Sequence, residues 1–341
     1  MKTLDWGHKI DQICSSTSFT GSVEIKKKGQ GVFSKGYGFR NRAEKLRNLP
    51  DTKFGIASGC KIFTAVAIAQ LVEKGMFSFK TPIHNIIDID FPHFSKEVTV
   101  HHLLTHTSGI PDYFNEEEMD DFEELWKESP MYCLKQLKDF LPMFQEKPMM
   151  FSPGGKFHYN NAGFIVLGLI IEYQTGVSFT DYVEKEILTR CQMKESGYYS
   201  MDALPGNIAY GYIKDQVSGT WKTNFYSVPV KGGADGGAYV TVKEMNRFWE
   251  GLMSFQLLSK PMTQQLIEPH VSVKEQIYYG YGLWIDSLDH GEVKYHVMGY
   301  DPGVSFHSCF YDVNELLVTV CSNESKGAYL IVKAVEDCMK M

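Results

Sequence analysis

The stretch FGIASGCKIFTAVAIAQLVEKG, residues 54–75, has the apolar spacing of an amphipathic helix. The periodic apolar positions are Ile62, Ala65, Val66, Ala69 and Val72. The first turn of this expected helix carries Ser58 and Lys61 among small and apolar neighbours. Because side chains three positions apart share one face of a helix, the sequence places a hydroxyl beside an amine.

This pairing of a serine with a lysine fits nucleophilic catalysis. A serine hydroxyl is a poor nucleophile alone and needs a base within hydrogen-bond reach, and a desolvated lysine can act as that base. A serine at a helix start also has a free backbone N–H that can point at a developing oxyanion. The alternative is an N-cap serine followed by a lysine that reaches the surface, and the four residues alone favour it.

A second motif lies in PGGKFHYNNAGFIVLGLIIE, residues 153–172, where Tyr159 and Asn161 come just before a strongly apolar helix. A phenol and an amide at the mouth of a helix can reach one cleft. The phenol can then move a proton, and the amide can hold a substrate carbonyl. The alternative is a tyrosine that packs its ring, with Asn161 as the helix N-cap.

The order of expected elements indicates a mixed α/β (α+β) chain. Strands are expected within 20–40, with a turn at 29–31, and at 276–285, 292–300, 304–311 and 315–323. Helices are expected at 54–75, 100–106, 116–126, 131–144, 161–175, 240–253 and from 325 onward. Strands at both ends with helices between them predict one sheet built by both termini. We therefore expect an α/β sheet domain at 1–80 and 225–341 and an inserted, mainly helical domain at 81–224.

Bulk composition excludes several classes of protein. The 341 residues are 43% hydrophobic and 22% charged, with a formal net charge of −7 and no basic cluster, so no nucleic-acid partner is expected. The N-terminus has no apolar core of a signal peptide, and the longest apolar run, 162–171, is too short to span a bilayer. Seven cysteines without framework spacing suggest reduced thiols in a cytoplasmic setting.

Taken in order, three segments resemble the serine β-lactamase and penicillin-binding protein superfamily, most closely its class C and D-aminopeptidase/esterase branch. The segments are FGIASGCKIFTAVAIAQLVEKG, VTVHHLLTHTSGIPDY and FSPGGKFHYNNAGFIVLGLIIEYQTG. The resemblance covers about residues 20–330 and implies an antiparallel sheet flanked by helices. It further implies that Ser58 is acylated, that Lys61 and Tyr159 share general base and acid duty, and that Asn161 orients the substrate.

The third motif of that superfamily is a basic residue followed by Thr and Gly on a strand that lines the cleft. The candidate here is KYHVMGYDPGVSF, residues 294–306. Counting back from Pro302 and Gly303 puts Val297, not His296, at the basic position. A one-residue bulge would restore His296 as a substrate-binding residue, and a half-exposed strand histidine is the alternative. We expect the strand to supply a second oxyanion N–H, from Gly299 or its neighbour.

Other signals receive plain structural interpretations. His102 and His106 lack a third zinc ligand, and Cys60 is expected to be a small buried residue that points away from Ser58. The segment GGADGGAY, residues 232–239, lacks the lysine of a phosphate-binding loop. The acidic run at 116–124 is expected to be a solvated helix face.

The sequence as a whole predicts a serine hydrolase that cleaves an ester or amide of a small molecule or peptide through an acyl-enzyme at Ser58. No metal or organic cofactor is required for this chemistry. A D-alanyl-D-alanine carboxypeptidase or a β-lactamase is the alternative within the same resemblance. A non-catalytic binding module that keeps the fold is the alternative from another class. Nothing in the sequence specifies an oligomeric state.

Overall fold

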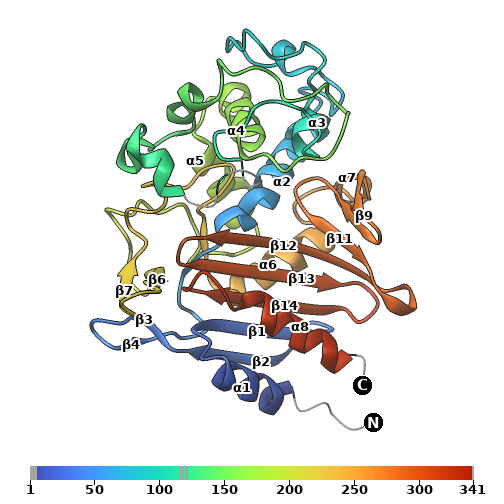
Figure 1. Ribbon diagram of the computed structural model, residues 1–341. Helices are drawn as coiled ribbons and strands as arrows, with labels where there is room; N and C mark the ends of the chain where they lie inside the picture. The colour runs from blue at the N-terminus through green and yellow to red at the C-terminus, as the bar shows by residue number, and fades with distance from the viewer. Residues whose placement is uncertain (1–5, 116–118, 120–121, 340–341) are drawn as a thin grey trace.

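The computed structural model describes residues 6–115, 119 and 122–339. Within these ranges the main sheet has eight strands, and each strand runs antiparallel to its neighbours. Their spatial order is β2 (Gln30–Tyr37), β1 (Gly21–Lys27), β14 (Leu316–Ser322), β13 (Val304–Tyr311), β12 (Val293–Asp301), β11 (Trp284–Ser287), β10 (Ile277–Tyr279) and β9 (Val271–Lys274). Both ends of the chain therefore build one sheet, and the predicted fold class is confirmed (Figure 1).

Helices cover both faces of this sheet. On one face, α8 (Ala328–Met339) packs on β13 and β14, and α1 (Trp6–Ser16) packs against α8. On the other face, α6 (Val242–Met253) contacts β14 and β1. Figure 1 shows α8 in front of the sheet and α6 behind it. Because side chains alternate along a strand, neighbouring residues of β12 face these two different layers.

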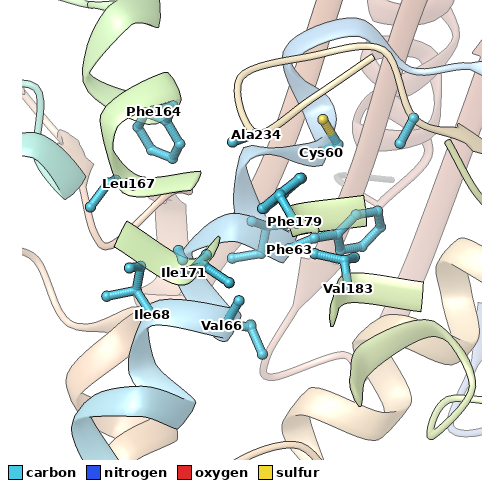
Figure 2. Close-up of a cluster of buried hydrophobic side chains, with 14 of the residues drawn as sticks. Cys60, Phe63, Val66, Ile68, Phe164, Leu167, Ile171, Phe179, Val183 and Ala234 are labelled. Atoms are coloured by element: carbon cyan, nitrogen blue, oxygen red, sulfur yellow. The ribbon is translucent and has the colours of Figure 1, made fainter. Parts of the chain in front are cut away.

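The helical layer centres on α2 (Lys61–Glu73) and α4 (Asn161–Thr175), which pack against each other. Every residue of α2 from Lys61 to Leu71 is buried. The expected amphipathic helix is therefore wrong, because α4, α5 (Phe179–Val183) and α7 (Lys260–Ile267) all pack against α2. Figure 2 shows Phe63 and Val66 of α2 within a cluster that also contains Phe164 and Ile171 of α4. As predicted, Gly176 follows α4, and it adopts the left-handed backbone that ends the helix.

Short elements complete the chain. The remaining α-helices are α3 (Val100–Leu104), α5 (Phe179–Val183) and α7 (Lys260–Ile267). The 3-10 helices are η1 (Ala57–Cys60), η2 (Ile83–Asn85), η3 (Phe122–Lys127), η4 (Met131–Cys133), η5 (Leu137–Met143) and η7 (Asp289–Gly291), and η6 (Glu184–Leu188) is a π-helix. Three small sheets pair β3 (Phe39–Asn41) with β4 (Leu46–Arg47), β5 (Phe54–Gly55) with β8 (Tyr239–Val240), and β6 (Tyr212–Lys214) with β7 (Trp221–Thr223).

Two predicted elements are wrong in detail. The single helix expected at 131–144 is instead η4 and η5, and Pro142 inside η5 lacks the N–H that an α-helix would need there. The single strand expected at 276–285 is a hairpin of β10 and β11, because Gly280 and Gly282 turn the chain between them. The helix expected at 116–126 lies partly outside the described residues, and its end forms η3.

One hydrophobic cluster contains residues from α2, α4, α6 and β12, so it runs across the expected boundary between sheet domain and inserted domain. The division at residues 80 and 225 stays a prediction. In the described part of the chain, no single helix has the length and apolarity to cross a membrane. One pair within the described residues, α4 and the segment 179–188, meets the criterion together, and its two members are bent by 79° to each other.

Candidate active site

Ser58 lies in η1, directly before α2, and is half-buried. The backbone of Ala57 is left-handed, with φ 45°, which is costly for a residue with a Cβ. Neighbouring backbone bonds hold this turn. The Ile56 N–H donates to Ala238 O at 2.9 Å, and the Gly237 N–H donates to Ala57 O at 3.2 Å. The turn is therefore anchored to the glycine-rich segment 232–239 from across the chain.

Lys61 is the hub of the site. Its Nζ lies 2.9 Å from Ser58 Oγ, 2.8 Å from Asn161 Oδ1 and 2.6 Å from the backbone O of Asp235. The last two atoms can only accept, so two N–H bonds of the amine are committed to them. The third direction of the nitrogen faces Ser58 Oγ. A neutral amine in this position would direct its lone pair at the serine hydroxyl.

Asn161 reaches Lys61 because its neighbour caps the helix. Asn160 is the N-cap of α4, and its Oδ1 accepts from the Gly163 N–H at 2.7 Å. The alternative in which Asn161 caps the helix is therefore wrong. The side chain of Asn161 instead belongs to the cleft beside Ser58.

Asp112 holds the first turn of α4 through its backbone N–H groups. Its Oδ2 accepts from the Asn161 N–H at 2.7 Å, and its Oδ1 accepts from the Ala162 N–H at 2.9 Å and the Tyr113 N–H at 2.8 Å. Burial raises the pKa of this carboxyl to about 7, although the backbone N–H groups oppose the rise. Asp112 thus holds Asn161 in place, a role that the sequence did not reveal.

The ring of Tyr159 lies close to Lys61 and is held by aromatic neighbours. Lys61 Nζ is 5.0 Å from the Tyr159 ring centroid. The ring of His106 packs on Tyr159 with centroids 4.3 Å apart, and Trp284 stacks at 6.5 Å. The structure therefore brings Ser58 of η1 and Lys61 of α2 close to Tyr159 and to Asn161, the first residue of α4.

His106 is a buried histidine whose hydrogen bonds define its tautomer. Its Nδ1 accepts from the Asn160 N–H at 3.0 Å, so the neutral ring carries its proton on Nε2, which faces Tyr279 Oη at 3.1 Å. Burial holds its pKa well below the usual range, so the ring is neutral. His102 takes part in the capping box of α3 with Thr99, and both histidines therefore make structural contacts. Among the described residues, no group of three or more His, Cys, Asp or Glu side chains could hold a metal ion.

The strand β12 carries the third motif in an unbroken register. Its residues pair one to one with β13 from Lys294↔Tyr311 to Asp301↔Val304. The bulge that would turn His296 to the cleft is therefore absent, and that prediction is wrong. Val297 packs in the core that contains Ile56 and Cys60, so it occupies the basic position on the Ser58 side.

His296 lies on the opposite face of β12, toward α8. Its Nε2 is 3.2 Å from Asp286 Oδ1, and its ring stacks on His307. Lys294, two residues away on the same face, bonds Asp286 and also Glu336 of α8 at 3.0 Å. This network is buried, so His296 is neither the half-exposed histidine nor the substrate ligand that the sequence suggested.

Gly299 meets the turn that carries Ser58. A Cβ at Gly299 would lie 2.0 Å from Ile56 O and 2.9 Å from Ser58 N, so only glycine fits. The two-residue turn at 302–303 makes Asp301 and Val304 a hydrogen-bonded pair. N–H groups alternate along such a ladder, so those of Gly299 and Asp301 point to β13, whereas the Tyr300 N–H points to the opposite edge. We therefore assign the second oxyanion N–H to Tyr300, the neighbour of Gly299.

A small cleft of about 70 Å³ opens beside Ser58. Its walls come from η1, from the glycine-rich segment, from the end of β12 and from 224–231, and they include Tyr113, Asn161, Asn224, Lys231, Asp235, Tyr239, Tyr300 and Asp301. Sequence reasoning set aside the glycine-rich segment and missed Asp235. The signal was present, because an aspartate between two glycine pairs has a backbone that can approach other groups closely.

The cysteines take no part in this site. Cys60 is fully buried, its Sγ faces Gly233 O, and burial raises its pKa to about 11. A thiol with a raised pKa is a poor nucleophile, and Cys60 is therefore the small buried residue that was expected. All seven cysteines have free thiols.

Residues 19–333 match the model of the Beta-lactamase family, so the chain belongs to this family. The penicillin binding protein from Bacillus halodurans has a similar structure, with a TM-score of 0.92 and 53% identity over 96% of this chain and 99% of that chain. Penicillin-binding protein 4* of Bacillus subtilis (strain 168) is 29% identical, covering 93% of this chain and 72% of its own length.

A third relative carries an enzyme's name. Teichoic acid D-alanine hydrolase of Staphylococcus aureus (strain NCTC 8325 / PS 47) is 25% identical over 278 residues, which cover 81% of this chain and 65% of that protein. With the family match, these relatives identify the protein as a serine hydrolase of the β-lactamase and penicillin-binding protein superfamily, as the sequence predicted.

Proposed function

We propose that the protein hydrolyses an ester or amide through an acyl-enzyme formed on Ser58. The observation that carries this proposal is the set of three close contacts of Lys61 Nζ, to Ser58 Oγ, Asn161 Oδ1 and Asp235 O. A binding module would gain nothing from an amine buried beside a hydroxyl, because burying it is costly. A catalytic site uses that amine to take the serine proton.

In the first half of the proposed reaction, Lys61 Nζ accepts the proton of Ser58 Oγ as that oxygen attacks the substrate carbonyl carbon. The carbonyl oxygen becomes an oxyanion between the N–H groups of Ser58 and Tyr300. The bond to the leaving group then breaks, and the leaving group takes a proton that passes from Lys61 through Tyr159. Asn161 holds the substrate by its amide, and Gly299 lets the strand approach Ser58 closely enough for this geometry.

In the second half, water attacks the ester of Ser58. Tyr159 or Lys61 accepts the water proton, the oxyanion forms again at the same two N–H groups, and Ser58 Oγ leaves with a proton. The sequence of events consumes one water and releases an acid and an alcohol or amine. No group outside the chain is needed for either half.

The substrate is a small molecule or a short peptide. The relative named for D-alanine hydrolysis makes a D-alanyl ester or amide the first candidate. A carboxypeptidase or β-lactamase reaction is less well supported, because Val297 stands where a cation would meet the carboxylate of such a substrate. Penicillin is therefore expected to acylate the protein poorly.

A fluorophosphonate label tests the proposal directly. We expect one covalent adduct on the peptide that contains Ser58, located by the mass shift of that peptide. Ser58→Ala should take no label although it folds. Lack of labelling of the wild-type protein, or a label elsewhere that Ser58→Ala retains, would contradict the assignment.

A further inference from the structure

The charges around the cleft differ from those expected for a carboxylate-binding site. Asp235 and Asp301 line it together with Ser58, and Lys231 lies at its rim. Asp301 affects the same region, because its charge raises the pKa values of Tyr113 and Tyr239 across the cleft, where burial is the larger cause. Val297 removes the cation from the strand wall. The wall therefore carries two carboxylates near the nucleophile and offers little to an anionic ligand.

Asp235 is a buried carboxylate with neutral partners. Its residue is 7% exposed, and its Oδ2 accepts from the Tyr113 hydroxyl. Lys61 is close, but its Nζ bonds the backbone O of Asp235. Among the described residues, no lysine or arginine forms an ion pair with the Asp235 carboxylate. Burial raises the pKa of the Asp235 carboxyl, although the charge of Lys61 opposes the rise, so ionisation of Asp235 is costly in the free site. The cost falls when a ligand supplies a paired cation.

The position of Asp235 suits one part of a bound acyl group. One amine bridges Asp235 O, at 2.6 Å, and Ser58 Oγ, at 2.9 Å. The Asp235 side chain therefore starts beside the atom that carries the acyl group during the reaction. Asp235 lines the cleft together with Ser58, and at the neighbouring Gly236 a Cβ would meet only the Ala57 and Ser58 backbone, 3.6–3.8 Å away. A substituent on the carbon next to the acyl carbonyl would point into this space.

We propose that the cleft selects acyl groups that carry a free ammonium next to the scissile carbonyl, and that Asp235 binds this ammonium with Asp301 adding to the attraction. The substrate class is thus an unblocked aminoacyl ester or amide. This inference rests on the proposed acyl-enzyme at Ser58. It assigns Asp235 a role in specificity, with no part in proton transfer.

Paired substrates test the inference. We would measure kcat/KM for D-alanine 4-nitroanilide and for its N-acetyl derivative, which lacks the charge, and repeat both with the L-enantiomers. For the wild-type protein the free amine should be preferred. Asp235→Asn keeps the shape of the side chain and should lower the ratio of the two values roughly 10- to 100-fold, as expected for a lost hydrogen bond to a charged group. Asp11→Asn removes a carboxylate from α1, on the far side of the sheet, and should leave the ratio unchanged.

Tyr113→Phe separates binding from structure, because it removes the phenol from Asp235 and leaves the charge. This variant should keep the preference for the free amine. If Asp235→Asn fails to fold, inhibition of the wild-type protein decides. Alaninamide should then compete with labelling of Ser58 at concentrations at least tenfold below those needed for N-acetylalaninamide.

The inference is overturned if the wild-type protein treats the two substrates alike, if Asp235→Asn lowers both equally, or if the two amides inhibit equally. In those cases labelling of Ser58 can still succeed, and the proposed hydrolase function stands without this specificity. If Ser58→Ala hydrolyses the substrates as fast as the wild type, the hydrolase proposal itself fails.

Discussion

The two walls of the cleft differ in which residues of the family's motifs they carry. The helical wall, built by η1, α2 and the start of α4, brings Ser58, Lys61 and Asn161 into hydrogen-bond contact. The strand wall, built by β12, offers a close-fitting Gly299 but has Val297 at its basic position. The residues proposed for bond making and the position at which the family's third motif has a cation thus lie on separate elements.

The reason lies in how each wall is fixed. Lys61 is buried within the core and its Nζ satisfies three partners at once, so any replacement leaves buried polar atoms unpaired. Val297 on β12 instead packs in the apolar cluster with Ile56 and Cys60, so this position of the strand wall contributes packing and no charge. The backbone of β12 is constrained differently, because Gly299 packs directly on the Ser58 turn.

The strongest test of the helical wall is the loss of its nucleophile. Ser58→Ala should reduce kcat for an activated ester by about 10⁴-fold or more, as removal of a nucleophile from a coupled hydrolytic unit does. The steady-state rate is measured on a nitrophenyl ester, and circular dichroism checks the fold. Activity within a few-fold of the wild type would show that Ser58 is not the nucleophile.

A second test distinguishes a base from a fixed charge. Lys61→Arg keeps a positive charge but cannot give up its proton, and its planar group does not fit three acceptors at 2.6–2.9 Å. Acylation should slow roughly 10²- to 10⁴-fold, the range of general base catalysis. Lys74→Arg at the other end of α2 is the matched control. Near-normal acylation by Lys61→Arg, followed by stopped flow, would mean that Lys61 acts only through its charge.

The strand wall is tested through its backbone. Gly299→Ala should push β12 away from η1 and displace the Tyr300 N–H, and the loss of one oxyanion donor costs about 10²-fold in kcat. Overpacking should also lower the free energy of unfolding by about 1–3 kcal/mol. Gly31→Ala is the control, because a Cβ there meets no atom within 4 Å. Unchanged kcat in Gly299→Ala would remove β12 from the oxyanion site.

His296 separates the two faces of the same strand. Because its side chain points away from Ser58, His296→Ala should change kcat/KM by less than about threefold, which is below 1 kcal/mol. The loss of its bond to Asp286 should lower the free energy of unfolding by about 1–3 kcal/mol. Neutral esters and substrates with a free carboxylate should respond alike. A selective loss for carboxylate substrates would place His296 in the cleft after all.

The last prediction concerns how the stability of the fold depends on pH. Burial lowers the pKa of His307 to about 3, so below its unfolded value of about 6.5 the unfolded chain binds a proton that the folded chain does not. The free energy of unfolding should therefore fall as pH falls from 6.5 toward 3, by up to ~1.4 kcal/mol per pH unit from this group. Asp112 has the opposite sign, since its pKa is raised to about 7 and its contribution falls as pH rises toward that value.

His307→Gln isolates the contribution of His307 to this pH dependence, because glutamine does not titrate. Glutamine can still bond the Tyr300 hydroxyl, which lies 2.5 Å from His307 Nε2. Denaturant unfolding of both proteins at several pH values gives the difference in slope. Parallel curves for the variant and the wild type would show that His307 does not carry the buried, neutral ring described here.

Local spacing made part of the site predictable. Ser58 and Lys61 are three residues apart, so any helical turn brings them together. The apolar run of α4 and Gly176 after it define that helix from the sequence alone. The contacts that could not be predicted join residues far apart in the sequence, such as the hydrogen bond from Lys61 to the backbone O of Asp235, 174 residues away. Asp112 and His106 were missed as supports for the same reason.

The sequence by itself determined the family and the α+β class, and it predicted Ser58, Lys61 and Asn161 as neighbours, because short-range periodicity and the order of motifs carry that information. The tertiary structure decided which side of β12 each residue faces. A shift of one residue in strand register exchanges the two faces, and pairing with β13 across the sheet fixes it. That register puts Val297 toward Ser58 and His296 toward α8, as counting back from Pro302 and Gly303 indicated, whereas the sequence alone left a bulge open.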